Sequence, residues 1–209
     1  MRGPKALILS ALALICGMLW FVPFATARWG FYGYGLVLAL YWAGFCVPLG
    51  LLFIGPAGLR RVVHLRLGGA RWVPWAAFGL VLMVLGVTLA QPPAGVTVTV
   101  VALALAAGAI NGLVEELYWR GAWLTVAGDD VRLFALGCVL FAAWHLPMAL
   151  AVGVVYHGGP VALVGGAAAL GLVWAAMAWR TRGIGWPMLS HAGLNMVVFQ
   201  TLVATNLPG

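Results

Sequence analysis

Two adjacent carboxylates and one guanidinium lie in an otherwise apolar stretch, as Glu115, Glu116 and Arg120. The chain contains only four acidic residues, and two of them are here. A charged side chain at the centre of a membrane-spanning helix costs roughly 2.5 to 3.5 kcal/mol, so such residues are rare and usually functional. Glu116 and Arg120 are four residues apart and can form an ion pair on a helix. We therefore interpret Glu115 as the carboxylate available for chemistry, with Glu116 and Arg120 as its supporting pair.

Three further polar side chains, His145, His191 and Asn195, lie in later apolar stretches. His191 and Asn195 are four residues apart, so they share one face of a helix. Counting about 1.5 Å per residue from the expected cytoplasmic helix ends places Glu115, His145, His191 and Asn195 at depths of about 15, 20, 10 and 17 Å. A hydrogen bond between membrane helices contributes only about 0.6 kcal/mol on average, which does not justify burying a carboxylate with two imidazoles. The sequence therefore predicts one shared site.

Asn111 precedes Glu115 by four residues and shares its helix face, beside Gly108 and Gly112. Glycines on a membrane helix allow a neighbouring helix to approach closely. We expect such an approach here. Taken alone, Asn111 is more simply interpreted as a hydrogen-bonding residue between helices than as a site residue.

The composition indicates a membrane protein. Hydrophobic residues make up 65% of the 209, charged residues 7%, and the mean hydropathy is +1.08. The formal net charge of +7 could suggest nucleic acid, but the basic residues lie between apolar stretches and form no single surface, so we expect no nucleic-acid partner.

We predict an all-α polytopic membrane protein with about seven transmembrane helices, in which the fourth, fifth and seventh carry the catalytic core. The chain forms a single domain over 1–209, with the motif-bearing core at about 97–205. The first stretch could instead be a cleaved signal peptide, but its length and Trp20 favour a retained helix. The expected spans are about 6–25, 31–54, 72–90, 96–126, 131–152, 161–179 and 184–205.

The distribution of basic residues predicts the orientation. With a cytoplasmic N-terminus, every basic residue except Arg28 lies on or near the cytoplasmic side, as the positive-inside rule requires. We expect an integral protein of a bacterial cell membrane, with the C-terminus outside and the site opening toward the cytoplasm. The expected cytoplasmic group is Arg2, Lys5, Arg60, Arg61, Arg66, Arg71, Arg120, Arg132, Arg180 and Arg182.

Three motifs occur in order on three predicted helices: Glu-Glu-x-x-x-Arg at 115–120, Phe-x-x-x-His at 141–145 and His-x-x-x-Asn at 191–195. Gly121 follows the arginine. This combination resembles the CPBP intramembrane proteases, also called the Abi or type II CAAX protease family, which includes the CAAX prenyl endopeptidases. The resemblance covers roughly residues 107–198, and the first three helices carry no motif that matches.

The resemblance implies hydrolysis of a peptide bond within the membrane. In chemical terms, Glu115, helped by His145, would take a proton from the attacking water. His191 and Asn195 would donate hydrogen bonds to the developing oxyanion. Arg120 would keep the Glu116 carboxylate ionised. The expected substrate is a peptide or a lipidated protein, such as a prenylated CAAX-type chain. The expected surroundings of the protein are membrane lipid.

Two alternatives remain at this stage. Glu115, His145 and His191 could bind a catalytic zinc ion, which would make the protein metalloprotease-like. The HExxH motif is absent, and asparagine is a poor zinc ligand but a good oxyanion donor, so we prefer a mechanism without a cofactor. A non-catalytic scaffold or carrier is the second alternative, although the sequence shows no internal repeat of the kind found in many carriers.

Overall fold

The computed structural model describes residues 3–207 and is all-helical, with no β-strand in that range. This confirms the all-α part of the predicted fold class. Within the described residues, five helical segments are long and apolar enough to cross a membrane. They are Pro4–Val62, Val73–Ala90, Val98–Ala127, Val131–Ala149 and Gly159–Thr181.

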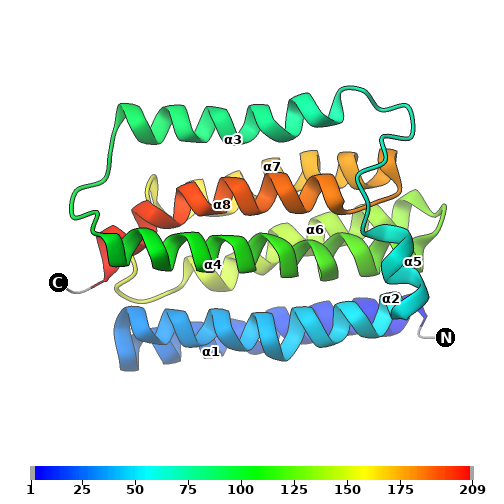
Figure 1. Ribbon diagram of the computed structural model, residues 1–209. Helices are drawn as coiled ribbons and strands as arrows, with labels where there is room; N and C mark the ends of the chain where they lie inside the picture. The colour runs from blue at the N-terminus through cyan, green and yellow to red at the C-terminus, as the bar shows by residue number, and fades with distance from the viewer. Residues whose placement is uncertain (1–2, 208–209) are drawn as a thin grey trace.

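The first of these segments reverses its direction at Gly30, which has a left-handed φ of 56° and a ψ of −136°. Residues 25 and 33 would be about 12 Å apart along a straight helix. Instead, Gly33 lies directly against the backbone of Ala25, so no side chain fits at Gly33. The reversal (Figure 1) divides the segment into two antiparallel rods that correspond to the predicted spans 6–25 and 31–54. The three elements of the segment are α1 (Pro4–Ala39), the π-helical η1 (Leu40–Cys46) and α2 (Val47–Val62).

The predicted seventh span corresponds to α8 (Gly185–Asn206), which is not among the five apolar segments. This helix carries Ser190, His191, Asn195 and Gln200, and these polar side chains lower its hydropathy. The count of seven transmembrane helices therefore stays a prediction.

The remaining helices lie side by side with α1 and α8 as one elongated bundle (Figure 1). The most extensive contact joins α4 to α8, while α6 packs against α7 and α1. At the edge, α3 packs along α8 and buries only Val73 and Ala77, both near its start. The bounds are α3 (Val73–Ala90), α4 (Val98–Glu116), η2 (Leu117–Ala122), α5 (Trp123–Ala127), α6 (Val131–Ala149) and α7 (Gly159–Thr181).

The contact between α4 and α8 depends on two glycines. A Cβ atom added at Gly108 would lie 2.6 Å from the carbonyl oxygen of Asn195, and one at Gly112 would lie 2.7 Å from the carbonyl carbon of His191. Any larger side chain would push the helices apart. The predicted close approach is thus confirmed, and it holds the backbone of α8 at His191 and Asn195 against α4.

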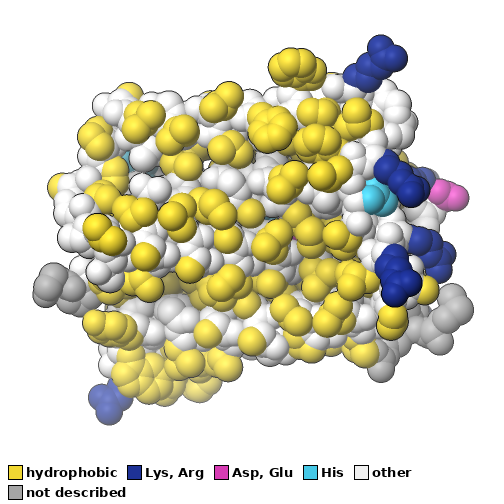
Figure 2. Space-filling view, in the orientation of Figure 1, with side chains coloured by type: hydrophobic (Ala, Val, Ile, Leu, Met, Phe, Trp, Pro, Cys, Tyr) yellow, Lys and Arg dark blue, Asp and Glu magenta, His cyan; other side chains and the backbone are white. Residues whose placement is uncertain are grey.

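Most of the basic residues gather at one end of the bundle, which we call the arginine-rich end (Figure 2). It includes the last turns of α2 and α7 and the turn before α6, where Arg182 pairs with Asp129 at 2.6 Å. Arg28 lies close to the reversal at Gly30, at the opposite end. Arg2, which was predicted to be cytoplasmic, lies outside the described residues. The arginines of this end are Arg60, Arg61, Arg66, Arg71, Arg132, Arg180 and Arg182.

The sides of the bundle between the two ends are covered by exposed apolar side chains (Figure 2). Examples are Trp75, Leu82 and Val98, which are 82%, 64% and 87% exposed. An apolar girdle of this kind is the surface that an integral membrane protein presents to lipid.

Candidate functional site

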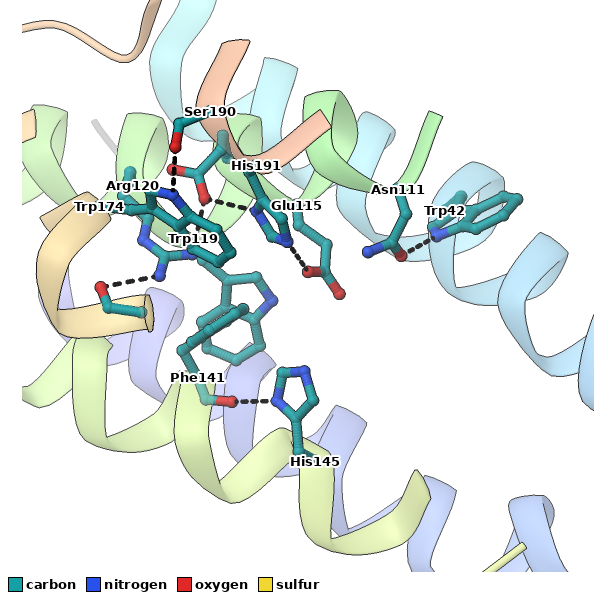
Figure 3. Close-up of polar contacts among 12 residues, drawn as sticks. Trp42, Asn111, Glu115, Trp119, Arg120, Phe141, His145, Trp174, Ser190 and His191 are labelled. Atoms are coloured by element: carbon teal, nitrogen blue, oxygen red, sulfur yellow. Dashed lines mark hydrogen bonds and ion pairs between the residues drawn. The ribbon is translucent and has the colours of Figure 1, made fainter. Parts of the chain in front are cut away.

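His191 lies between the two adjacent carboxylates and faces each with a different ring nitrogen (Figure 3). Its Nδ1 is 2.8 Å from Oε1 of Glu116, and its Nε2 is 3.6 Å from Oε2 of Glu115. Neighbouring residues on a helix point about 100° apart, so Glu115 and Glu116 do not meet at one point. One imidazole between them contacts both.

Hydrogen-bond chemistry assigns the proton on this ring. An ionised carboxylate only accepts hydrogen bonds, so Nδ1 of His191 donates to Glu116. The contact from Nε2 to Glu115, at 3.6 Å, is longer than a direct hydrogen bond. Nε2 therefore faces the Glu115 carboxylate across a gap at the centre of the site.

Arg120 forms the predicted ion pair with Glu116. Its Nη1 is 3.0 Å from Oε1 of Glu116, and its Nη2 donates to the carbonyl oxygen of Gly171 at 3.0 Å. The guanidinium also lies over the ring of Phe141, 3.9 Å from the ring centre. Glu116 and Arg120 are 0% and 1% exposed, so both charges depend on these contacts for compensation.

Gly171 is required at this position of α7. A Cβ atom there would lie 2.7 Å from the ring of Phe141 and 3.1 Å from Nη2 of Arg120. The bare backbone of α7 can therefore approach the guanidinium and accept its hydrogen bond.

Two residues outside the sequence motifs hold the ring of His191 in place. Trp174 stacks on it, with ring centres 3.7 Å apart and planes 17° from parallel. The indole Nε1 of Trp174 donates to Oγ of Ser190 at 3.1 Å, and this hydroxyl donates to the carbonyl oxygen of Ala77 at 3.1 Å. Sequence reasoning missed Trp174 and Ser190. The only signal was that Ser190 directly precedes the histidine of the third motif.

His145 lies apart from this cluster (Figure 3). Its Nδ1 is 2.9 Å from the carbonyl oxygen of Phe141 on the same helix. Because a carbonyl only accepts, Nδ1 carries the proton, and Nε2 is left as the nitrogen that can accept one. Within residues 3–207, His145 makes no hydrogen bond or ion pair with Glu115. The two side chains share a cavity but not a contact.

A cavity of about 320 Å³ joins the predicted residues. Its polar lining includes Glu115, His145, His191 and Asn195, which were the four predicted catalytic residues, and also Asn111. Asn195 is 8% exposed, and no hydrogen bond of its side chain is found among the described residues. Most of the remaining wall is apolar, with contributions from α3, α6, α7 and α8.

The cavity extends from these residues away from the arginine-rich end. Its wall includes 84–91 at the end of α3, 162–174 in the first part of α7 and 194–202 in the second part of α8. Tyr156 and His157, in the turn between α6 and α7, also line it. In Figure 1 these segments lie in the half of the bundle opposite the arginine-rich end.

On the other side, between Glu115 and the arginine-rich end, large side chains pack closely around Arg120. Arg120, Trp123, Met177 and Ile184 are each 0% or 1% exposed there. The sequence predicted both that the arginine-rich end is cytoplasmic and that the site opens toward the cytoplasm. If the substrate enters through the cavity, these two predictions conflict, because the cavity lies in the half of the bundle away from the arginine-rich end. Counting the depth of single residues cannot show which half of a bundle contains a cavity.

The donor set of the zinc alternative is not assembled. Among residues 3–207, no three side chains of His, Cys, Asp or Glu are grouped so that they could hold a metal ion. His191 directs one nitrogen at Glu116 and the other at Glu115, while His145 stands apart with Nδ1 on a backbone carbonyl. These residues do not fit a zinc site in this arrangement.

Comparison with protein-family models gave one match, described as "Type II CAAX prenyl endopeptidase Rce1-like", over residues 97–197. Comparisons with curated proteins and with solved structures gave no match. The matched range runs from the start of α4 into α8 and contains all three sequence motifs together with every polar residue of the cavity centre. It thus confirms the resemblance found from the motifs: residues 97–197, nearly half of the chain, are similar to the Rce1-like type II CAAX prenyl endopeptidases.

Proposed function

We propose that this protein is an intramembrane endopeptidase that hydrolyses a peptide bond of a membrane-associated protein, with lipidated CAAX-type chains as the first class to test. The observation that carries the proposal is one largely apolar cavity that Glu115, His145, His191 and Asn195 all line. The family match supports protease chemistry at this place. The apolar girdle and the apolar cavity wall both suit a substrate that comes from the membrane.

The charges of the buried cluster balance when one proton is shared by Glu115 and His191. Two carboxylates, the guanidinium and a doubly protonated His191 then sum to zero, whereas a neutral imidazole beside two carboxylates would leave one negative charge without compensation in apolar surroundings. When His191 holds this proton, Glu115 is an ionised base and the Nε2–H of His191 is a donor.

Hydrolysis can proceed from that state. Glu115 takes a proton from a water molecule while the water oxygen attacks the scissile carbonyl, and Nε2 of His145 can accept a hydrogen bond from the same water. Asn195 and the Nε2–H of His191 donate to the oxyanion that forms. The proton then passes to the amide nitrogen, the carbon–nitrogen bond breaks, and the products are a carboxylic acid and an amine. The Arg120–Glu116 pair holds His191 in position throughout.

The test is Glu115→Gln, which keeps the shape of the side chain and removes its basicity. We expect cleavage of a quenched-fluorescent farnesylated CAAX-type peptide by the purified protein in proteoliposomes to fall by roughly 10²- to 10⁴-fold, the usual contribution of a general base. Asp129→Asn is the matched control, because that carboxylate is 97% exposed and lies at the arginine-rich end. Full cleavage by the Glu115→Gln protein would refute the proposal.

The orientation is part of the same proposal. The clustering of arginines at one end supports a cytoplasmic location for that end. The cavity would then lie in the outer half of the membrane, so the substrate would enter from that half rather than from the cytoplasm.

A further inference from the structure

Asn111 is held in one orientation by a tryptophan from another part of the chain. Nε1 of Trp42, on η1, donates to Oδ1 of Asn111 at 2.7 Å. An indole N–H can only donate, so it selects the oxygen of the amide and turns the NH₂ group to the other side. Figure 3 shows this NH₂ group on the side of the amide that faces Glu115.

The fixed NH₂ group is directed into the cavity. Asn111 is 7% exposed, lines the same cavity as Glu115 and lies one helical turn before it on the same face of α4. Within residues 3–207, its Nδ2 makes no hydrogen bond. A donor that is buried at the wall of a cavity and oriented by a second residue is suited to a ligand that brings an acceptor.

We propose that Asn111 is a substrate-binding residue, whose Nδ2 donates a hydrogen bond to a backbone carbonyl of the substrate peptide next to the scissile bond. Trp42 is its positioning residue. The proposal rests on the function proposed above, because the acceptor is a peptide that reaches Glu115. A peptide carbonyl is the ligand that matches: it is an acceptor without charge, it occurs once per residue of any substrate, and its distance from the scissile carbonyl is fixed by the backbone.

The competing explanation is that Asn111 only ties α4 to η1. The two explanations differ in what each partner contributes. If the bond matters only for packing, then loss of Trp42 Nε1 and loss of the Asn111 amide have equal effects. If Nδ2 binds substrate, the amide contributes something that the indole does not.

The experiment compares Trp42→Phe, Asn111→Leu and the double variant with the wild type, using the farnesylated CAAX-type peptide as the probe and measuring KM, kcat and Tm. We expect Asn111→Leu to raise KM roughly 3- to 10-fold, the value of one lost hydrogen bond, with kcat within about twofold of the wild type. Trp42→Phe should have a smaller effect on KM, because the amide is still present but free to rotate. The double variant should match Asn111→Leu in KM. Trp75→Phe, at a lipid-facing and 82% exposed position, is the control for loss of an indole.

Equal KM values for Asn111→Leu and Trp42→Phe, with equal losses in Tm, would overturn the proposal in favour of packing alone. If Asn111→Leu does not fold, Asn111→Ala replaces it, because alanine removes the amide without adding charge or volume at the cavity wall. We expect a raised KM at a retained Tm, and an unchanged KM would overturn the proposal. Failure of the proposed function looks different: the wild type would then show no cleavage that depends on Glu115.

Discussion

The two halves of the bundle treat buried charge in different ways. Toward the arginine-rich end, Glu116 and Arg120 are enclosed and form an ion pair, Glu116 also contacts His191, and Arg120 donates to a backbone carbonyl. In the other half, Glu115 faces a cavity of about 320 Å³, and within residues 3–207 its one ion-pair contact is to Nε2 of His191, at 3.6 Å. Glu115 and Glu116 are adjacent in the chain, yet Glu116 is enclosed by packed side chains, whereas Glu115 lies at the wall of a cavity.

The difference shows how a small membrane protein can hold a histidine next to a carboxylate at a cavity wall. The enclosed pair stabilises one nitrogen of His191, and the opposite nitrogen of that ring is presented to the hollow half. The ring is also clamped by Trp174, so its position does not depend on the substrate. His191, at the cavity, is thus held by the ion pair of Glu116 and Arg120 behind it.

The largest expected contrast concerns access to the two ends. We expect a cysteine in place of Gln91, at the cavity end of α3, to react with a membrane-impermeant maleimide only from outside the cell, and one in place of Arg66 only from the cytoplasmic side. The background protein carries alanine at Cys16, Cys46 and Cys138, which are all free. Labelling in intact cells and in inside-out vesicles gives the comparison, and reversed labelling would place the cavity on the cytoplasmic side.

The next contrast concerns the two carboxylates. Glu116→Gln leaves Arg120 buried without an ionic partner, so we expect a loss of about 3 to 5 kcal/mol in the free energy of unfolding, together with a clear drop in Tm. Glu115→Gln should leave Tm nearly unchanged while removing activity. Thermal unfolding of both variants in the same detergent is the measurement. A Glu116→Gln protein as stable as the wild type would break the distinction between an enclosed and a cavity-facing carboxylate.

A smaller effect is expected at the contact that joins the halves. Gly112→Ala places a Cβ atom against the backbone of α8 at Ala192, so α4 and α8 must move apart at a cost of about 1 to 3 kcal/mol. The same substitution at Gly86, where no atom lies within 4 Å, is the matched control and should be neutral or slightly stabilising. Tm and peptide cleavage are measured together, and we expect both to fall for Gly112→Ala alone. Equal behaviour of the two variants would show that the close approach of the helices is not needed.

The smallest expected effect is that of a chelator. Because the site residues do not form a metal-binding group, exhaustive treatment with a chelator should leave the cleavage rate unchanged. Loss of activity that zinc alone restores would instead require Glu115, His145 and His191 to rearrange around an ion. Glu115 would then be a metal ligand rather than a free carboxylate at the cavity wall.

Features that lie within one helix could be predicted from the sequence. The ion pair of Glu116 with Arg120 follows from a spacing of four, and the close approach at Gly108 and Gly112 follows from residue size. The contact of His191 with both carboxylates could not be predicted, because it depends on the register between α4 and α8. Depth counting predicted that Glu115, His145, His191 and Asn195 lie near one another, and they do line one cavity, but it did not resolve one contact from another.

Features that depend on helices without motifs were out of reach. Trp174 stacks on His191 from α7, and Trp42 reaches Asn111 from η1, yet neither has a spacing that links it to the site. The side on which the cavity lies was also unpredictable. It depends on where α3, α7 and α8 diverge, and that is a property of packing rather than of any one residue.

The position of α3 has a consequence for the size of the substrate. Its two buried residues, Val73 and Ala77, lie in its first turns, whereas its last turns, up to Gln91, border the cavity. Because only the first turns of α3 contain buried residues, we expect its last turns to be the part of this cavity wall that moves most easily. We expect the width available to a substrate chain to be set by the surrounding bilayer as much as by the protein, so that cleavage of bulky peptides depends on lateral pressure in the membrane.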